Sequence, residues 1–101
     1  MKIKNITTIN IEEIPQITWV QIETDNGIIG LGETFFGPKA VSGCIHEIFS
    51  PMLIGENPFN IEKHWKNMFD MANAFGHAGA EMRAISAIDM ALWDIVGQSV
   101  K

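Results

Sequence analysis

Residues 79–98 read GAEMRAISAIDMALWDIVGQ, and this stretch decides the fold. Large apolar side chains recur in it at the three- and four-residue spacing of one helical face: Met82, Ile85, Ile88, Leu92 and Ile95. A second stripe is made of small residues, namely Ala80, Ala84, Ala87 and Ala91. Met90, Trp93 and Val96 add apolar surface outside both stripes. Because a helix with so much apolar surface is normally buried on two sides, we predict a long helix that is only partly covered by the residues before it.

Size and composition favour one small folded domain. The chain has 101 residues, of which 47% are hydrophobic and 19% charged, as in globular rather than disordered chains. The net charge of -5 and the lack of a basic cluster disfavour nucleic-acid binding. The single cysteine, Cys44, fits a reducing compartment, and we see neither a signal peptide nor an apolar run of the ~20 residues that a membrane span needs. We therefore expect a soluble, cytoplasmic protein.

The first third of the chain has the two-residue periodicity of strands. Residues 2–12 place one set of side chains on one predicted face: Ile3, Thr7, Ile9 and Ile11. Pro15 interrupts this pattern, and residues 17–24 alternate again, with Val20 and Ile22 on one face. Asn26-Gly27 then predicts a hairpin turn into a third strand, residues 28–35. Gly30 and Gly32 share a face of that strand, which indicates close approach of another segment.

Helical periodicity begins after Gly37-Pro38. The first predicted helix ends near Ser50 because Pro51 follows it, and the second has Asn57 as N-cap and Pro58 at its first position. The apolar side predicted for the second helix consists of Ile61, Trp65, Met68, Phe69 and Ala72. Three strands followed by three helices indicate an α+β fold with an antiparallel meander.

Spacing alone yields no catalytic or metal-binding group. His46 and His64 have no partner at metal-ligand spacing and are predicted to be ordinary surface or boundary residues, and His77 a structural or solvated one. We interpret Cys44 as a core thiol and Glu33 as a buried hydrogen-bond acceptor rather than a catalytic group. Asp89 and Asp94 lie roughly 140° apart around a helix, so they do not form a carboxylate pair. Each is expected to accept a hydrogen bond from a donor.

Three segments, in order, resemble the enolase superfamily, in its mandelate racemase and muconate lactonizing enzyme branch. They are ETDNGIIGLGE (residues 23–33), LIGENPFNIEKHW (residues 53–65) and SAIDMALWDIVGQ (residues 86–98). The second segment departs from the family pattern in having Asn57 where the family has Asp, and it is most similar to acid-sugar dehydratases such as galactonate dehydratase. Together the segments cover nearly the whole chain.

The resemblance implies that residues 1–101 are an N-terminal capping domain, with residues 79–101 leading into a (β/α) barrel. In this family the barrel carries the acidic Mg²⁺ ligands and the bases that remove the proton α to a carboxylate. We expect that barrel to be absent from this chain, so no catalytic or metal-binding residue is assigned to it and the chain alone is predicted to be inactive. The capping loops imply a set of substrate-binding residues that act only with a barrel: Glu13, Ile14, Pro15, Gln16, Trp19, Thr34, Phe35 and Phe36.

The expected function is therefore that of a substrate-specificity domain of a Mg²⁺-dependent acid-sugar dehydratase, racemase or cycloisomerase. The alternative is a freestanding, non-catalytic binding or oligomerisation module. The partner is expected to be the barrel domain or a second copy of the chain. Not all of the large apolar residues of the last helix can face a core built from three strands and two helices; they are Ile85, Ile88, Leu92, Trp93 and Ile95. We predict that those left exposed drive self-association, by packing of these helices or by domain swapping at Gly76–Gly79.

Overall fold

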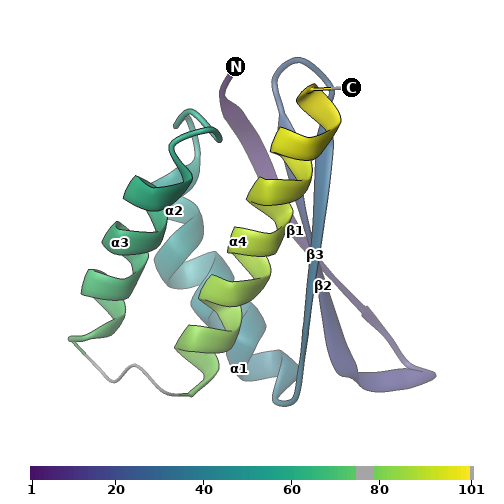
Figure 1. Ribbon diagram of the computed structural model, residues 1–101. Helices are drawn as coiled ribbons and strands as arrows, with labels where there is room; N and C mark the ends of the chain where they lie inside the picture. Colours follow the sequence, from purple (N-terminus) through teal and green to yellow (C-terminus); the bar gives the residue numbers. More distant parts are fainter. Residues whose placement is uncertain (75–78, 101) are drawn as a thin grey trace.

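A computed structural model of the chain describes residues 1–74 and 79–100 (Figure 1). An antiparallel sheet in the order β1-β2-β3 is formed by β1 (Ile3–Ile11), β2 (Ile14–Thr24) and β3 (Ile29–Phe35). The helical segments that follow are α1 (Pro38–Gly43), the π-helical η1 (Cys44–Phe49), α2 (Ser50–Leu53), α3 (Ile61–Ala72) and α4 (Ala80–Ser99). Since α1, η1 and α2 run on without a break, the predicted α+β order of three strands and three helices is confirmed.

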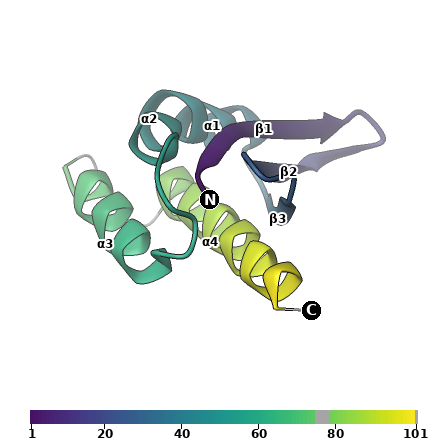
Figure 2. The same cartoon turned by 90° about the horizontal axis from the view of Figure 1, so that it is seen from above.

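Helix α4 is the centre of the domain. It lies between α3 and the sheet in both views (Figures 1 and 2) and contacts β2, β3, α1, η1 and α3. Its fully buried residues are Ala84, Ile85, Ala87, Ile88, Ala91, Leu92 and Ile95. The helix that carries the two predicted apolar stripes is thus covered by the sheet on one side and by helices on others.

The glycines of β3 explain how closely α4 approaches the sheet. A Cβ atom built on Gly32 would collide with the carbonyl oxygen of Ala87, and one built on Gly30 would collide with that of Ala91. Backbone carbonyls of a helix cannot move aside as a flexible side chain can, so these positions require glycine. The close approach predicted from the spacing of the two glycines is confirmed.

Side chains of α4 also pair with the edge of β3. The Leu31 N–H donates to Asp94 Oδ2 at 2.8 Å, and Gln98 Nε2 donates to the Ile29 carbonyl oxygen at 2.7 Å. Free edge groups of a sheet are otherwise open to pairing with another chain. The donor predicted for Asp94 is therefore present, and it is a backbone N–H at the sheet edge.

The strand boundaries and the β1 register differ from the prediction. A bulge shifts the β1–β2 register between Ile3 and Asn5, so Ile3 and Ile6 are buried while Ile11 is exposed. The extra residue moves the following side chains to the other face, which a strict two-residue period does not anticipate. Strand β2 starts at Ile14, three residues earlier than predicted. In the β2–β3 turn only Gly27 has a positive φ, 88°, as in a type I turn followed by a glycine bulge.

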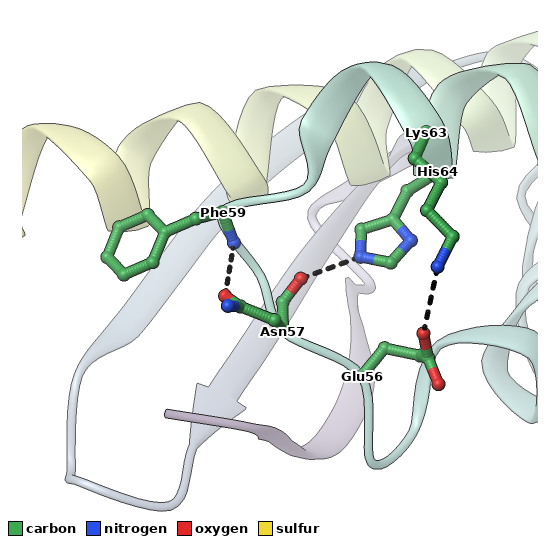
Figure 3. Close-up of polar contacts among 5 residues, drawn as sticks. All are labelled: Glu56, Asn57, Phe59, Lys63 and His64. Carbon is green, nitrogen blue, oxygen red and sulfur yellow. Dashed lines mark hydrogen bonds and ion pairs between the residues drawn. The ribbon is translucent and has the colours of Figure 1, made fainter.

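The helix boundaries were wrong at both prolines. The first helix continues through Pro51 to Leu53, because the chain widens into η1 just before it and the Ser50 N–H bonds to the Ile45 carbonyl, five residues back. This wider spacing relieves the clash that a proline ring makes with the preceding helical turn. Helix α3 begins at Ile61, with Asn60 as N-cap. Asn57 instead closes a local turn, its Oδ1 accepting from the Phe59 N–H at 2.9 Å (Figure 3).

The buried face of α3 is rotated from the predicted one. It consists of Ile61, His64, Met68 and Ala72. His64 is only 2% exposed, and its Nε2 lies 2.7 Å from the Asn57 carbonyl oxygen (Figure 3). Trp65 and Phe69 stack on one another on the outer side, with ring centroids 5.0 Å apart. The prediction of a surface or boundary role for His64 was wrong, since its ring hydrogen bond allows it to be buried.

The predicted exposed patch on the last helix is much smaller than expected. Of the five residues predicted not all to face the core, Ile85, Ile88, Leu92 and Ile95 are buried within the chain and only Trp93 stays exposed. Sheet, α3 and the α1–η1 segment cover the helix from several directions, which a count of the preceding elements underestimates. Trp93, 55% exposed, and Met90 remain on the surface. The predicted swapping hinge at Gly76–Gly79 and His77 lie outside the described residues, apart from Gly79.

Candidate functional site: the loop-bearing end of the sheet

The structure brings the two predicted capping segments together at one end of the sheet. The start of β2 pairs with the end of β3, with Ile17 opposite Phe35 and Thr18 opposite Thr34. Just beyond the ladder, the Phe36 N–H donates to the Gln16 carbonyl oxygen at 2.7 Å. Residues separated by about twenty positions in sequence therefore lie together at this end of the sheet, among them Gln16, Trp19, Thr34, Phe35 and Phe36.

The other predicted residues lie farther out. Glu13 is exposed in the turn between β1 and β2, and Ile14 and Pro15 are exposed at the first two positions of β2. In Figure 1 this turn lies away from the helices. These residues belong to the tip of the β1–β2 hairpin and lie before the first residue of β2 that pairs with β3.

The two faces of the sheet divide the site residues. Thr34 lies on the helix-facing side with Gly30 and Gly32, whereas Phe35 lies on the outer side with Leu31. Trp19, half-buried, is on the outer side of β2 opposite Glu33. Glu33 is exposed, so its predicted role as a buried acceptor was wrong. Glu33 alternates with the buried glycines of β3 and so lies on the outer side of the strand.

Arg83 of α4 is a site residue that the sequence did not indicate. Its Nη1 donates to the Phe35 carbonyl oxygen at 3.0 Å. Its guanidinium carbon lies 5.1 Å from the ring centroid of Phe35 and 5.5 Å from that of Phe36, within cation–π range of both. The two rings are 60% and 61% exposed. A contact across 48 residues leaves no trace in local spacing; the one available signal was that Arg83 is the only arginine of the sequence.

A groove lies on the other side of this loop, between the β1–β2 hairpin and α1. It has a volume of about 500 Å³ and is lined by Thr8, Asn10, Ile11, Glu12, Pro15, Pro38, Lys39 and Ser42. The Ser42 hydroxyl oxygen is buried without a hydrogen-bond partner in the part of the chain that the structure describes. The lining thus combines hydroxyl, amide and charged groups with apolar ones, in a groove that includes Glu12 and Pro15 near the hairpin tip.

Three ionisable side chains outside this end of the sheet, those of Cys44, Asp89 and His46, have environments that follow from their places in the fold. Burial raises the pKa of the Cys44 thiol, and the nearby Glu81 and Glu47 carboxylates raise it further, so this half-buried thiol is not an activated nucleophile. Burial also raises the pKa of Asp89, and within residues 1–74 and 79–100 no donor bonds to its carboxylate, contrary to the prediction. His46 is exposed, and its Nε2 lies 2.8 Å from Thr8 Oγ1, joining η1 to β1.

The described residues contain neither a metal-binding cluster nor a membrane-spanning helix. No three His, Cys, Asp or Glu side chains come together among residues 1–74 and 79–100. Within the same ranges, no helix has the length and apolar character that crossing a membrane requires.

Comparisons with known proteins agree with this architecture. A D-galactonate dehydratase from Verminephrobacter eiseniae is 37% identical over 102 residues, which cover 99% of this chain and 26% of that protein. The 3,6-anhydro-D-galactonate cycloisomerase from Zobellia galactanivorans superimposes with a TM-score of 0.92 at 33% identity, over 99% of this chain and 29% of that one. A racemase from Streptomyces coelicolor A3(2), solved with bound magnesium, superimposes with a TM-score of 0.86 at 27% identity. The match covers 98% of this chain and 33% of the racemase chain.

The family of this chain is shown by a family model that matches nearly the whole sequence. The chain spans about a quarter of the length of the dehydratase relative, 26%, in keeping with one domain of a larger architecture. Residues 5–101 match the model of the mandelate racemase / muconate lactonizing enzyme N-terminal domain. This chain therefore belongs to that N-terminal domain family of the enolase superfamily.

Proposed function

We propose that this domain caps the substrate in an enolase-superfamily enzyme that acts on an acid sugar, as a dehydratase or as a racemase or cycloisomerase. The observation that carries the proposal is the pairing of Gln16–Trp19 with Glu33–Phe36, which presents two exposed aromatic rings at one end of a rigid sheet. Recognition loops carried on a rigid scaffold are a common way to set specificity. The named activities of the dehydratase and cycloisomerase relatives supply the substrate class.

We assign the metal and the bases to the part of the parent enzyme outside these residues. The magnesium in the Streptomyces racemase supports Mg²⁺ as the metal of the complete enzyme. The part of this chain that the structure describes does not fit such an ion, because it has no cluster of three candidate ligands. The contribution of the domain is thus to bind and orient the substrate and to exclude water, which places reacting groups correctly without chemistry of its own.

The exposed face of α4 is the proposed contact with the barrel. Met90 and Trp93 lie on it, and Trp93 and Val96 line a groove of about 530 Å³ together with Phe59, Asn60, Ile61, Glu62 and Lys63. Aromatic residues in such grooves are typical interface anchors. A freestanding module would use the same face to bind a second copy. Sedimentation at micromolar concentration separates the two: a monomer favours the capping domain, and a dimer that Trp93→Glu dissociates favours the module.

The capping role is tested in the complete enzyme by replacing a ring at the loop-bearing end. We expect Trp19→Ala to raise KM for the acid-sugar substrate about tenfold while Mg²⁺ affinity stays unchanged, because the ring touches substrate and not metal. Trp65→Ala is the matched control, since Trp65 is an outer tryptophan on α3 that stacks on Phe69. Loss of Mg²⁺ affinity with an unchanged KM would refute the assignment.

A further inference from the structure

The backbone at Phe36 is in a conformation that its side chain disfavours. Its φ is 76°, the only positive φ of a non-glycine residue in the described part of the chain. A bulky residue rarely adopts this region, and it does so where surrounding contacts hold it there. Gly37 follows with φ 62°, so the chain passes from β3 into α1 through two successive left-handed residues.

Apolar burial does not account for this conformation. The Phe36 ring is 61% exposed and the Phe35 ring 60%, so neither is held by a core. The Phe36 N–H bond to Gln16 fixes the backbone on one side, and the Val41 N–H bond to the Gly37 carbonyl, 3.0 Å, fixes the start of α1. The side chains are held from α4, by the guanidinium that contacts both rings and the Phe35 carbonyl oxygen.

We propose that Arg83 is the positioning residue of the β3–α1 loop: it fixes the Phe35 and Phe36 rings in the orientation in which they meet the substrate. That the rings meet a substrate rests on the proposed function; that Arg83 holds them does not. A planar cation suits this task, because one face can stack on aromatic rings while its edge donates to a carbonyl oxygen. Lysine offers the charge without the planar surface, and methionine offers neither.

The positioning role is measured on the full 101-residue chain, without any catalytic assay. We expect Arg83→Met to speed hydrogen exchange of the Phe36 amide about tenfold, because a charge-assisted hydrogen bond and two cation–π contacts are lost. The Leu31 amide, bonded to Asp94 on the same strand, should not change. Arg83→Lys should restore part of the protection, and Lys66→Met, which removes a cation on α3, should have no effect.

A spectroscopic signal reports the stacking itself. Because the sequence has a single arginine, its Nε–Hε group gives one assignable NMR signal. Ring currents should displace that signal from its free position, and Phe35→Leu should move it back toward that position. An Arg83→Met chain with native Phe36 exchange, or an arginine signal at its free position, would overturn the proposal.

The complete enzyme separates this proposal from the proposed function. If Arg83→Met speeds exchange at Phe36 and raises KM with unchanged Mg²⁺ affinity, the positioning role of Arg83 and the capping function both stand. If the loop is released in the chain and KM is unchanged, the capping role of the rings is wrong, and with it the orientation toward substrate. If exchange at Phe36 is unchanged while Trp19→Ala still raises KM, only the role of Arg83 is wrong.

Discussion

Gly32 is where a single methyl group would separate the sheet from its central helix. Gly32→Ala places a Cβ against the Ala87 carbonyl oxygen, which belongs to helical backbone and cannot rotate away. We expect the free energy of unfolding to fall by about 3 kcal/mol, at the upper end of overpacking effects. Urea unfolding followed by circular dichroism measures it. Gly97→Ala is the control, because Gly97 lies on α4, the helix that Gly32 contacts, and has open space around it. This change should raise the free energy of unfolding by about 1 kcal/mol through helix propensity. Equal effects of the two changes would contradict the close approach.

Asp89 makes the stability of the chain depend on pH. Burial raises the pKa of its carboxyl in the folded state above the unfolded value, so the folded chain holds this proton more tightly. The contribution of the protonated Asp89 carboxyl to the stability of the fold is fully present below the ordinary carboxyl pKa. It is lost as the pH rises through the raised pKa of the folded state. We therefore expect Asp89→Asn to raise the thermal midpoint at neutral pH and to leave it unchanged near pH 3. Calorimetry at both pH values checks this, and a lower midpoint for Asp89→Asn at neutral pH would show that the charge is stabilised by a donor.

At the scale of elements, α4 protects the free edge of β3. Asp94→Ala removes the acceptor of the Leu31 N–H and a partner of Gln98, whose Nε2 lies 3.2 Å from Asp94 Oδ2. We expect a loss of about 1–2 kcal/mol in the free energy of unfolding, and concentration-dependent association because the edge groups become available. Denaturant titration and light scattering measure the two effects. Asp70→Ala, which breaks an exposed helical ion pair with Lys66, should cost about 0.5 kcal/mol at most and cause no association.

The elements also show what sequence can and cannot predict here. Strong periodicity located β2, β3 and α4, and the Gly30/Gly32 spacing predicted their contact, because both signals are local. The boundaries at Pro51 and Pro58 were wrong, since a π-helical turn and an Asx turn resolve the backbone constraints that proline imposes. The capping segments were predicted from the family resemblance, and their pairing follows from the hairpin register. Arg83 was missed because its contacts join residues far apart in the sequence.

At the scale of the whole molecule, the domain divides into a buried core around α4 and an exposed, loop-bearing end of the sheet. The large buried side chains gather around α4, whereas exposed aromatic rings and a groove beside the β1–β2 hairpin lie at the end where β2 begins and β3 ends. The face of α4 that carries Trp93 stays exposed. This division predicts that the domain determines which substrate is accepted and that the metal and the bases lie elsewhere in the enzyme.

An exchange of domains measures this division most directly. This chain would replace the matching segment of the Verminephrobacter dehydratase, and kcat/KM would be measured over a panel of acid sugars together with Mg²⁺ affinity. Arg83→Met in the same hybrid provides a variant in which only the loop is altered. We predict that the hybrid binds Mg²⁺ as the parent does, that its substrate preference shifts by about tenfold or more, and that Arg83→Met reduces this shift. A hybrid with the substrate preference of the parent and a weakened Mg²⁺ affinity would contradict the account.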